Sequence, residues 1–203
     1  MADFLFDIGN VLLAFDFEKS LSTLLPPDHP NPQATIGKLL ERKDSFETGE
    51  ISVEDFTTWA LGILESDATP AEFHQAWQNI FTPNQAMWQN VRQLSDQGHR
   101  LILFSNINAI HAPWIFEEFP QFEIFRHAVL SFEAKSIKPQ ESIYQHAIDK
   151  YALHTSETFY IDDMEKNVQT GYQMGFQTHH YDINDHQAFE DWLSENLPST
   201  ENK

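Results

Sequence analysis

The chain has 203 residues, with no cysteine and with 12 Lys and Arg against 31 Asp and Glu, which give a net charge of -19. The lack of cysteine excludes disulfides, thiolate nucleophiles and cysteine-ligated metal sites, and the negative charge argues against nucleic acid or anionic membrane as a partner. The length suits one sizeable core with a small insertion.

The first apolar run begins almost at Met1, which leaves no room before it for a secretory signal. Nowhere does the sequence contain a stretch of ~20 apolar residues that could span a bilayer. We therefore expect a cytoplasmic protein. Only the polar end, residues 198–203, is expected to be disordered.

Five short apolar runs rich in β-branched and aromatic residues predict β-strands. In chain order they are residues 4–6, 101–104, 128–130, 158–161 and 178–181. Segments of helical periodicity lie between them, so the pattern is that of βαβ units. It predicts an α/β fold with a Rossmann-like parallel sheet of about five strands and helices on both faces.

Three of the connecting helices have recognisable ends. Thr82-Pro83 predicts the start of a helix that ends at Gly98, Pro139 precedes a helix over 141–151, and a third helix follows Glu165 and ends near Gly175.

The first connection is longer than a single crossover requires, because more than 80 residues separate Val11 from Arg100. Within it, Ser52 followed by Asp55, and Thr69-Pro70 followed by Glu72, are typical of helix N-termini. We therefore predict a small helical cap at residues 16–81, inserted after the first strand into a catalytic core made of residues 1–15 and 82–203.

Polar residues stand at the ends of the predicted strands, where an open parallel sheet binds its ligands. Asp7 follows the first strand, Ser105 and Asn106 the second, and Asp162 and Asp163 the fourth, while Lys138 precedes the helix after the third. Three acids at one edge repel one another unless a lysine or a divalent cation neutralises them, and their hard oxygen ligands suit Mg²⁺. The set predicts phosphoryl transfer.

The expected roles follow from this chemistry. Asp7 attacks phosphorus with one oxygen and holds Mg²⁺ with the other, Ser105 and Asn106 donate hydrogen bonds to the phosphoryl oxygens, and Lys138 offsets negative charge. Adjacent strand residues point to opposite faces, so one of Asp162 and Asp163 binds the metal directly and the other orients a water or Lys138. On this ground either Asp162 or Asp163 can be the direct metal ligand.

Four ordered motifs resemble those of the haloacid-dehalogenase-like (HAD) hydrolases. They are Phe-Asp-Ile-Gly-Asn-Val-Leu-Leu at 6–13, Leu-Phe-Ser-Asn at 103–106, Ile-Lys-Pro at 137–139 and Tyr-Ile-Asp-Asp-Met-Glu-Lys-Asn at 160–167. The chain is most similar to the bacterial phosphatases that act on glucose 1-phosphate and to the phosphatase domain of soluble epoxide hydrolase, which carry a helical cap after the first motif. The resemblance implies a Mg²⁺-dependent phosphatase that forms an aspartyl-phosphate on Asp7 and acts on a small phosphate ester, with sugar phosphates favoured.

Gly9 stands where phosphatases of this family usually have a second aspartate that acts as general acid and base. The resemblance implies that the Gly9 backbone carbonyl still binds Mg²⁺, whereas proton delivery, typically worth ~10²–10⁴ in rate, needs another group. Asp16 and His111 are the candidates, although each alone is more often structural.

Two other functions are compatible with Gly9: a metal-independent 2-haloacid dehalogenase, and a catalytically reduced protein that binds a phosphometabolite. Several further residues have two interpretations. Asn167 tethers the metal loop or is exposed, Arg42 and Lys43 meet the substrate or water, Lys135 is expected to be solvated, and His179-His180 is expected to be structural.

Overall fold

The computed structural model describes residues 1–26 and 28–197, so the disorder expected for 198–203 lies outside the described residues. Five strands form one parallel sheet in the order β5-β4-β1-β6-β7. They are β1 (Asp3–Phe6), β4 (Arg100–Ser105), β5 (His127–Leu130), β6 (Thr158–Asp162) and β7 (Gln177–His180). All five predicted strands are confirmed, each to within one residue at either end, because each is a short apolar run that the sheet buries.

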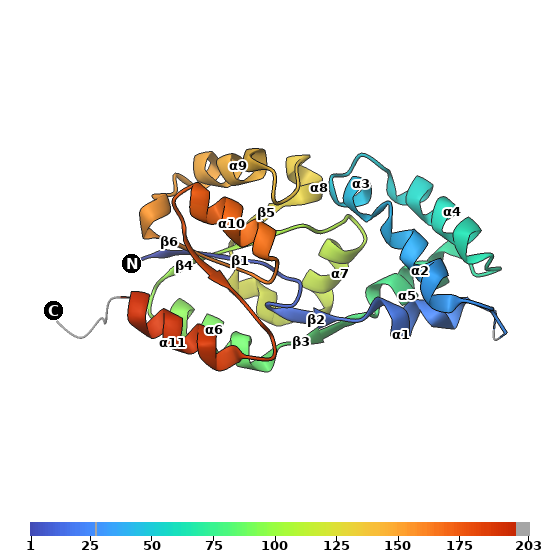
Figure 1. The fold of residues 1–203 in the computed structure, drawn as a ribbon, viewed down its shortest axis with the longest axis horizontal. Helices are drawn as coiled ribbons and strands as arrows, with labels where there is room; N and C mark the ends of the chain where they lie inside the picture. Colours follow the sequence, from blue (N-terminus) through green and yellow to red (C-terminus); the bar gives the residue numbers. More distant parts are fainter. Residues whose placement is uncertain (27, 198–203) are drawn as a thin grey trace.

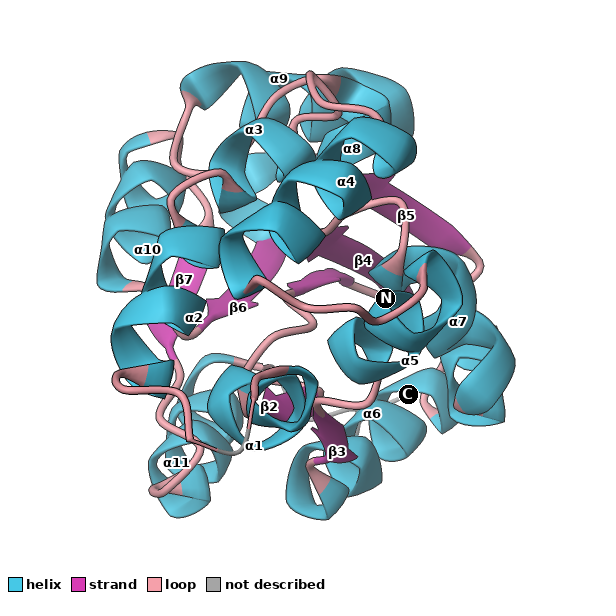
Figure 2. Ribbon diagram, turned by 90° about the vertical axis from the view of Figure 1, so that its right-hand side faces the viewer, coloured by secondary structure: helices cyan, strands magenta, loops and turns pink. Residues whose placement is uncertain are grey.

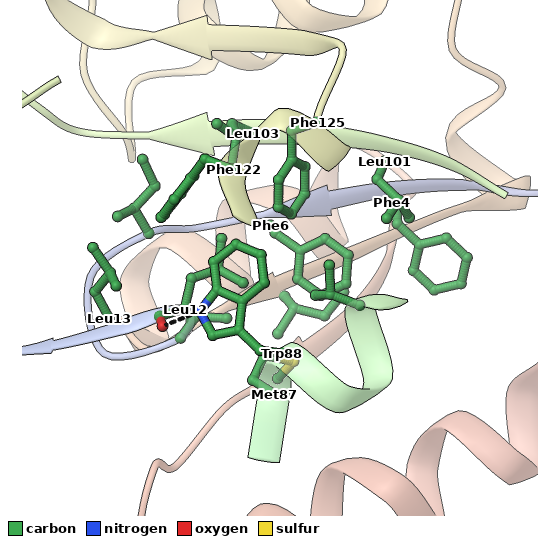
Figure 3. Close-up of a cluster of buried hydrophobic side chains, with 14 of the residues drawn as sticks. Phe4, Phe6, Leu12, Leu13, Met87, Trp88, Leu101, Leu103, Phe122 and Phe125 are labelled. Atoms are coloured by element: carbon green, nitrogen blue, oxygen red, sulfur yellow. Dashed lines mark hydrogen bonds between the residues drawn. The ribbon is translucent and has the colours of Figure 1, made fainter. Parts of the chain in front are cut away.

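Helices cover both faces of the sheet, as predicted. Along β1, Phe4 and Phe6 pack with α6 (Gln85–Asp96), α7 (His111–Glu118) and α11 (His186–Asn196), whereas Leu5 points to the opposite face and packs with α9 (Glu141–Tyr151). Figure 1 shows α9 and α10 (Glu165–Gln173) above the sheet, and α6 and α11 below it. In the lower layer the Trp88 indole donates a hydrogen bond of 3.0 Å to the Leu12 carbonyl (Figure 3).

The predicted helices at 141–151 and after Glu165 are confirmed by α9 and α10, but the predicted start at Thr82-Pro83 is wrong. Phe81–Pro83 is a strand, β3, that pairs antiparallel with β2 (Leu13–Phe15), and the helix begins only at Gln85. Asn84 is its N-cap, because its side chain accepts a hydrogen bond from the Met87 amide.

The segment between β2 and β3 is helical. It contains α1 (Phe17–Leu21), α2 (Pro32–Leu40), α3 (Lys43–Glu47), α4 (Val53–Leu64) and α5 (Pro70–Gln78). Its buried apolar side chains, among them Phe46, Phe56 and Trp77, form a cluster of their own that Ile110 joins from the loop before α7. Figure 2 looks from this side and shows α2, α4 and α5 in front of the strands.

Both predicted N-termini in this segment are present. The Ser52 side chain accepts from the Asp55 amide at the start of α4, and Thr69 forms a capping box with Glu72 at the start of α5. The shorter elements are α8 (Ser131–Ala134), η1 (Ser22–Leu24), η2 (Pro120–Ile124) and η3 (Thr155–Glu157). No helix in the described part of the chain combines the length and apolar character needed to cross a membrane.

Candidate active site

The order of the strands brings three of the predicted residues to one edge of the sheet. β1 lies between β4 and β6, with Phe6 opposite both Leu103 and Ile161. Asp7, directly after β1, is therefore flanked by Ser105 at the end of β4 and Asp162 at the end of β6. All three of these side chains are buried. A cluster of polar groups beneath the surface indicates a site rather than a solvated loop.

Lys138 lies in the middle of this cluster. Its Nζ is 2.6 Å from Oδ2 of Asp162 and 2.9 Å from Oδ1 of Asp7, and it donates a hydrogen bond of 2.7 Å to the Phe104 carbonyl. Burial favours the neutral amine, but the carboxylates of Asp162 and Asp7 outweigh that effect and raise the pKa of Lys138. The side chain is a fixed positive charge at the edge of the sheet.

The two adjacent aspartates have different surroundings. Asp162 is fully buried and accepts four hydrogen bonds, from Lys138 and Tyr160 on Oδ2 and from the Met164 amide and Asn167 on Oδ1. Asp163 is half-buried, and within residues 1–26 and 28–197 its side chain accepts one hydrogen bond of 2.9 Å, from Asn10 Nδ2 to Oδ2. Asp163 therefore has lone pairs to offer a ligand, whereas those of Asp162 are used within the protein.

The charges of the cluster do not balance without a further cation. A carboxylate oxygen from each of Asp7, Asp162 and Asp163 lies within 4.8 Å of the other two, and the Lys138 ammonium forms ion pairs with Asp7 and Asp162. Burial is the main cause that raises the pKa of Asp7 to about 7; Lys138 opposes it, and Asp162 and Asp163 add to it. A divalent cation would neutralise the two remaining negative charges.

The donor set fits such a cation. Asp7 Oδ1 is buried and, although it lies close to Lys138, has no partner with hydrogen-bond geometry among the residues that the structure describes. Gly9 lines the same cavity as Asp7 and Asp163, and hard oxygen ligands of this kind suit Mg²⁺. Asp7, Asp163 and Gly9 are thus the residues that could hold it directly, with Asp162 acting through Lys138 and the loop after β6.

Ser105 and Asn106 differ in how free they are to bind a phosphoryl group. The Asn106 side chain accepts from the Lys138 amide at 2.8 Å and donates to the Lys138 carbonyl at 2.9 Å, so it mainly holds the lysine in place. Among the residues that the structure describes, one N–H of that side-chain amide has no acceptor. The Ser105 hydroxyl makes, with these same residues, only a long contact of 3.4 Å to the Asn106 carbonyl, which leaves it the freer donor.

A cavity of about 340 Å³ lies over these residues. Its floor contains Asp7, Ser105, Lys138 and Asp163, while its other walls carry side chains from β2, β3 and the helical segment. The wall residues are Phe15, Phe17, Leu40, Lys43, Asp44, Glu47 and Phe81. The cavity thus joins a charged floor to a mixed apolar and ionic wall, a shape suited to a small ligand with one anionic end.

Neither candidate proton donor is supported. Asp16 lies away from the floor, is exposed, caps α1 through the Lys19 amide and lines a separate open hollow of about 990 Å³. His111 lines the catalytic cavity, but its Nε2 donates to the Trp77 carbonyl and its Nδ1 accepts from Asn108. Burial lowers the pKa of His111 to about 3, so the ring is neutral, and its one N–H is bonded to the Trp77 carbonyl rather than offered to a leaving group.

Asn167, Lys43 and Arg42 each had two interpretations, and the structure shows the surroundings of each side chain. Asn167 is buried and tethers the loop through Asp162, so its exposed alternative is wrong. Lys43 lines the cavity, whereas the Arg42 guanidinium lies over the Trp59 ring at 4.7 Å.

Lys135 and the histidine pair complete this set. Lys135 is exposed but donates to the Gly49 carbonyl at 3.1 Å, so it is not merely solvated. His179 packs on Trp192, and His180 bonds to the Asp163 carbonyl, which agrees with a structural role for the pair.

Three residues near the cluster were not singled out from the sequence: Asn10, Tyr160 and Glu47. Asn10 belongs to the first motif, but the sequence gives no local sign of its hydrogen bond to the distant Asp163. Tyr160 lies within a continuous apolar run, which is typical of a core residue. Glu47 stands four residues after Lys43, a spacing that indicates a helical ion pair but gives no sign that the pair faces a cavity.

The sequence matches the haloacid dehalogenase-like hydrolase family over residues 40–180, a stretch that includes the second, third and fourth motifs. A D-ribitol-5-phosphate phosphatase from Bacteroides thetaiotaomicron is 23% identical over 186 residues, which cover 85% of this chain and 88% of that protein.

Two solved structures have the same fold. An enzyme of this family from Bacteroides thetaiotaomicron, in complex with magnesium and inorganic phosphate, is 24% identical with a TM-score of 0.73 and covers 88% of this chain and 93% of its own. An L-2-haloacid dehalogenase from Xanthobacter autotrophicus, with chloropropionic acid covalently bound, is 14% identical with a TM-score of 0.67. The match covers 98% of this chain and 84% of the dehalogenase chain.

Proposed function

Because the chain belongs to the haloacid dehalogenase-like hydrolase family, we propose that it is a Mg²⁺-dependent phosphatase of small phosphomonoesters, with Asp7 as the nucleophile. One observation carries the proposal: three carboxylates cluster at the edge of the sheet, the Lys138 ammonium pairs with two of them, and the excess of negative charge calls for a divalent cation. The similarity to a D-ribitol-5-phosphate phosphatase supports the same class of substrate.

In the proposed reaction a carboxylate oxygen of Asp7 attacks phosphorus, the ester P–O bond breaks, and the leaving oxygen takes up a proton from solvent water as the alcohol departs. Water then attacks the aspartyl-phosphate, which releases inorganic phosphate and regenerates Asp7. Lys138 offsets the negative charge of Asp7 and of the phosphoryl group, and the Ser105 hydroxyl donates a hydrogen bond to a phosphoryl oxygen. Asn106 holds Lys138 in place and offers its one unused N–H.

Asp7, Asp163 and the Gly9 carbonyl would hold Mg²⁺, which when bound supplies positive charge next to the phosphoryl oxygens. Asp162 keeps Lys138 and Asn167 in position. Residues 16–81 act as a cap over a core of residues 1–15 and 82–203, so the leaving group is selected by the walls that α1 to α3 contribute.

Dehalogenases share the fold and an aspartate nucleophile, and one of them is a structural neighbour. Such an enzyme has no need of a metal-binding carboxylate, whereas Asp163 in this chain keeps lone pairs directed at the Asp7 cluster. This difference favours the phosphatase over the dehalogenase.

The test measures phosphate release from a panel of sugar, polyol and aryl phosphates, with Mg²⁺ and with a chelator. We expect release that depends on Mg²⁺ and that Asp7→Asn abolishes, while the exposed control Asp96→Asn retains it. Chloride release from 2-chloropropionate in the presence of chelator would instead identify a dehalogenase. Tight binding of a phosphate ester with no turnover would identify a binding protein.

A further inference from the structure

One wall of the catalytic cavity carries an ion pair from α3. Lys43 and Glu47 are one helical turn apart, and Lys43 Nζ lies 2.7 Å from Glu47 Oε2. Both residues line the 340 Å³ cavity that also contains Asp7. A phosphoryl group on the floor would therefore project its leaving group toward this pair.

The pair has hydrogen-bonding capacity left over. The Glu47 side chain is 9% exposed, and within residues 1–26 and 28–197 its one side-chain partner is Lys43. The Lys43 ammonium has three N–H donors, of which one goes to Glu47, and Asp44 Oδ1 at 3.6 Å is beyond hydrogen-bond distance. Unused donors and an unused carboxylate oxygen thus remain at the edge of the cavity.

Stability alone does not account for this arrangement. An exposed pair one turn apart on a helix contributes only ~0.3–0.5 kcal/mol, and a buried pair is often no better than apolar side chains of similar size. The surrounding wall is aromatic, from Phe15, Phe17 and Phe81, and would accept apolar side chains at these positions. Binding of a ligand therefore explains a charged pair in this wall better than a contribution to stability does.

The position of α3 over the floor is held by a close contact with the core. Lys135 donates to the Gly49 carbonyl just after α3, and a Cβ atom at Gly49 would come within 2.8 Å of the Phe132 carbonyl oxygen. The backbone at Gly49 also has φ of +67°, which favours glycine. The ion pair is thereby kept in the wall of the cavity.

We propose that Lys43 and Glu47 bind hydroxyl groups of the leaving group, and so select phosphate esters of small, uncharged polyhydroxy alcohols. The proposal rests on the phosphatase function proposed above. A hydroxyl can donate to the Glu47 carboxylate while its neighbour accepts from the Lys43 ammonium, and charge-assisted hydrogen bonds of this kind are among the stronger ones. The aromatic rings would cover the carbon-bound hydrogens of the same alcohol.

The balance of charge in the wall also excludes anionic leaving groups. Among the ionic side chains that line the cavity outside the Asp7 cluster, Lys43 and Lys166 are matched in number by Asp44 and Glu47, so these side chains carry no net positive charge to attract a second phosphate or a carboxylate. The cavity volume of about 340 Å³ limits the leaving group to a small molecule.

The experiment compares kcat/KM for D-ribitol 5-phosphate with kcat/KM for n-pentyl phosphate, which has the same number of carbons and no hydroxyl. We expect the wild-type chain to prefer the polyol ester, which gives a ratio of the two kcat/KM values, polyol over alkyl, above one. Glu47→Gln and the double variant K43Q/E47Q should lower this ratio by about 10- to 100-fold, mainly through KM for the polyol ester. The exposed controls Glu50→Gln and Lys38→Gln should leave it within about twofold. The double variant avoids an unpaired buried charge, and the ratio does not depend on the fraction of protein that is folded.

An unchanged ratio in both Glu47→Gln and K43Q/E47Q, with the wild type active on both esters, would overturn the role of the pair and leave the phosphatase proposal standing. A lack of phosphate release from either ester by the wild type with Mg²⁺ would instead contradict the phosphatase function, and this inference with it.

Discussion

The Lys138 ammonium donates a hydrogen bond to Asp162 Oδ2 over 2.6 Å, and neither side chain is exposed. Desolvating two charges is costly, and here further hydrogen bonds to the Phe104 carbonyl and to the other oxygen of Asp162 offset that cost. Asp162 is therefore committed to Lys138 and to its own loop. We infer that it orients the site, and that Asp163 binds the metal.

Removing the positive charge should destabilise the fold as well as the site. Lys138→Met leaves Asp162 buried without its ion pair, so we expect a loss of about 3–5 kcal/mol in the free energy of unfolding, measured with denaturant, together with loss of turnover. The exposed control Lys38→Met should change stability by less than about 0.5 kcal/mol. K138M/D162N should recover part of the stability and none of the activity. A loss below about 1 kcal/mol in Lys138→Met would contradict the structural role of the pair.

The two adjacent aspartates should separate metal binding from stability. Asp163→Asn should weaken Mg²⁺ binding, measured by titration calorimetry, by about tenfold or more with little change in unfolding free energy, because its side chain has one hydrogen-bond partner in the described part of the chain. Asp162→Asn should cost about 1–3 kcal/mol of stability, since it disturbs four buried hydrogen bonds. The opposite order of effects would assign the metal to Asp162.

His111 should make the protein less stable as pH falls. Its pKa is about 3 in the folded chain, whereas the usual value is 6.5. Between pH 6.5 and pH 3 the unfolded chain therefore binds a proton on this residue, whereas the folded chain does not. The free energy of unfolding consequently decreases as pH falls through 6.5 toward 3.

From pH 7 to pH 5 this residue should cost about 2 kcal/mol of unfolding free energy. Denaturant unfolding at both pH values should show a smaller loss for His111→Gln than for the wild type. The exposed control His146→Gln should match the wild type. Equal losses in all three proteins would mean that His111 becomes charged in the folded state.

Gly49 should tolerate no side chain. A Cβ atom there would lie 2.5 Å from Lys135 Nζ and 2.8 Å from the Phe132 carbonyl oxygen, on a backbone with φ of +67°. We expect Gly49→Ala to lower the unfolding free energy by about 1–3 kcal/mol. Gly62→Ala is the matched control, since Gly62 lies within α4 with no atom near its Cβ position, and it should raise stability by up to about 1 kcal/mol. Thermal unfolding measures the stability of both variants. Equal changes in Gly49→Ala and Gly62→Ala would contradict the close contact at Gly49.

The local patterns of the sequence determined much of this protein. Apolar runs located the five strands to within one residue, because a buried parallel strand needs a short continuous apolar segment whatever surrounds it. The side chains after those runs, from Asp7 to Asp163, followed from the rule that the carboxyl ends of parallel strands meet at one edge. The long first connection indicated the helical insertion.

Contacts between residues distant in the chain were decided only by the tertiary structure. The pairing of Phe81–Pro83 with β2 replaced a predicted helix start, because strand pairing over such a separation leaves no local signal. Which of Asp162 and Asp163 is free depends on hydrogen bonds from Lys138, Tyr160 and Asn10, and the neutrality of His111 depends on its burial against Trp77. Such properties arise from desolvation and from the supply of partners in space, which a sequence does not display until it is folded.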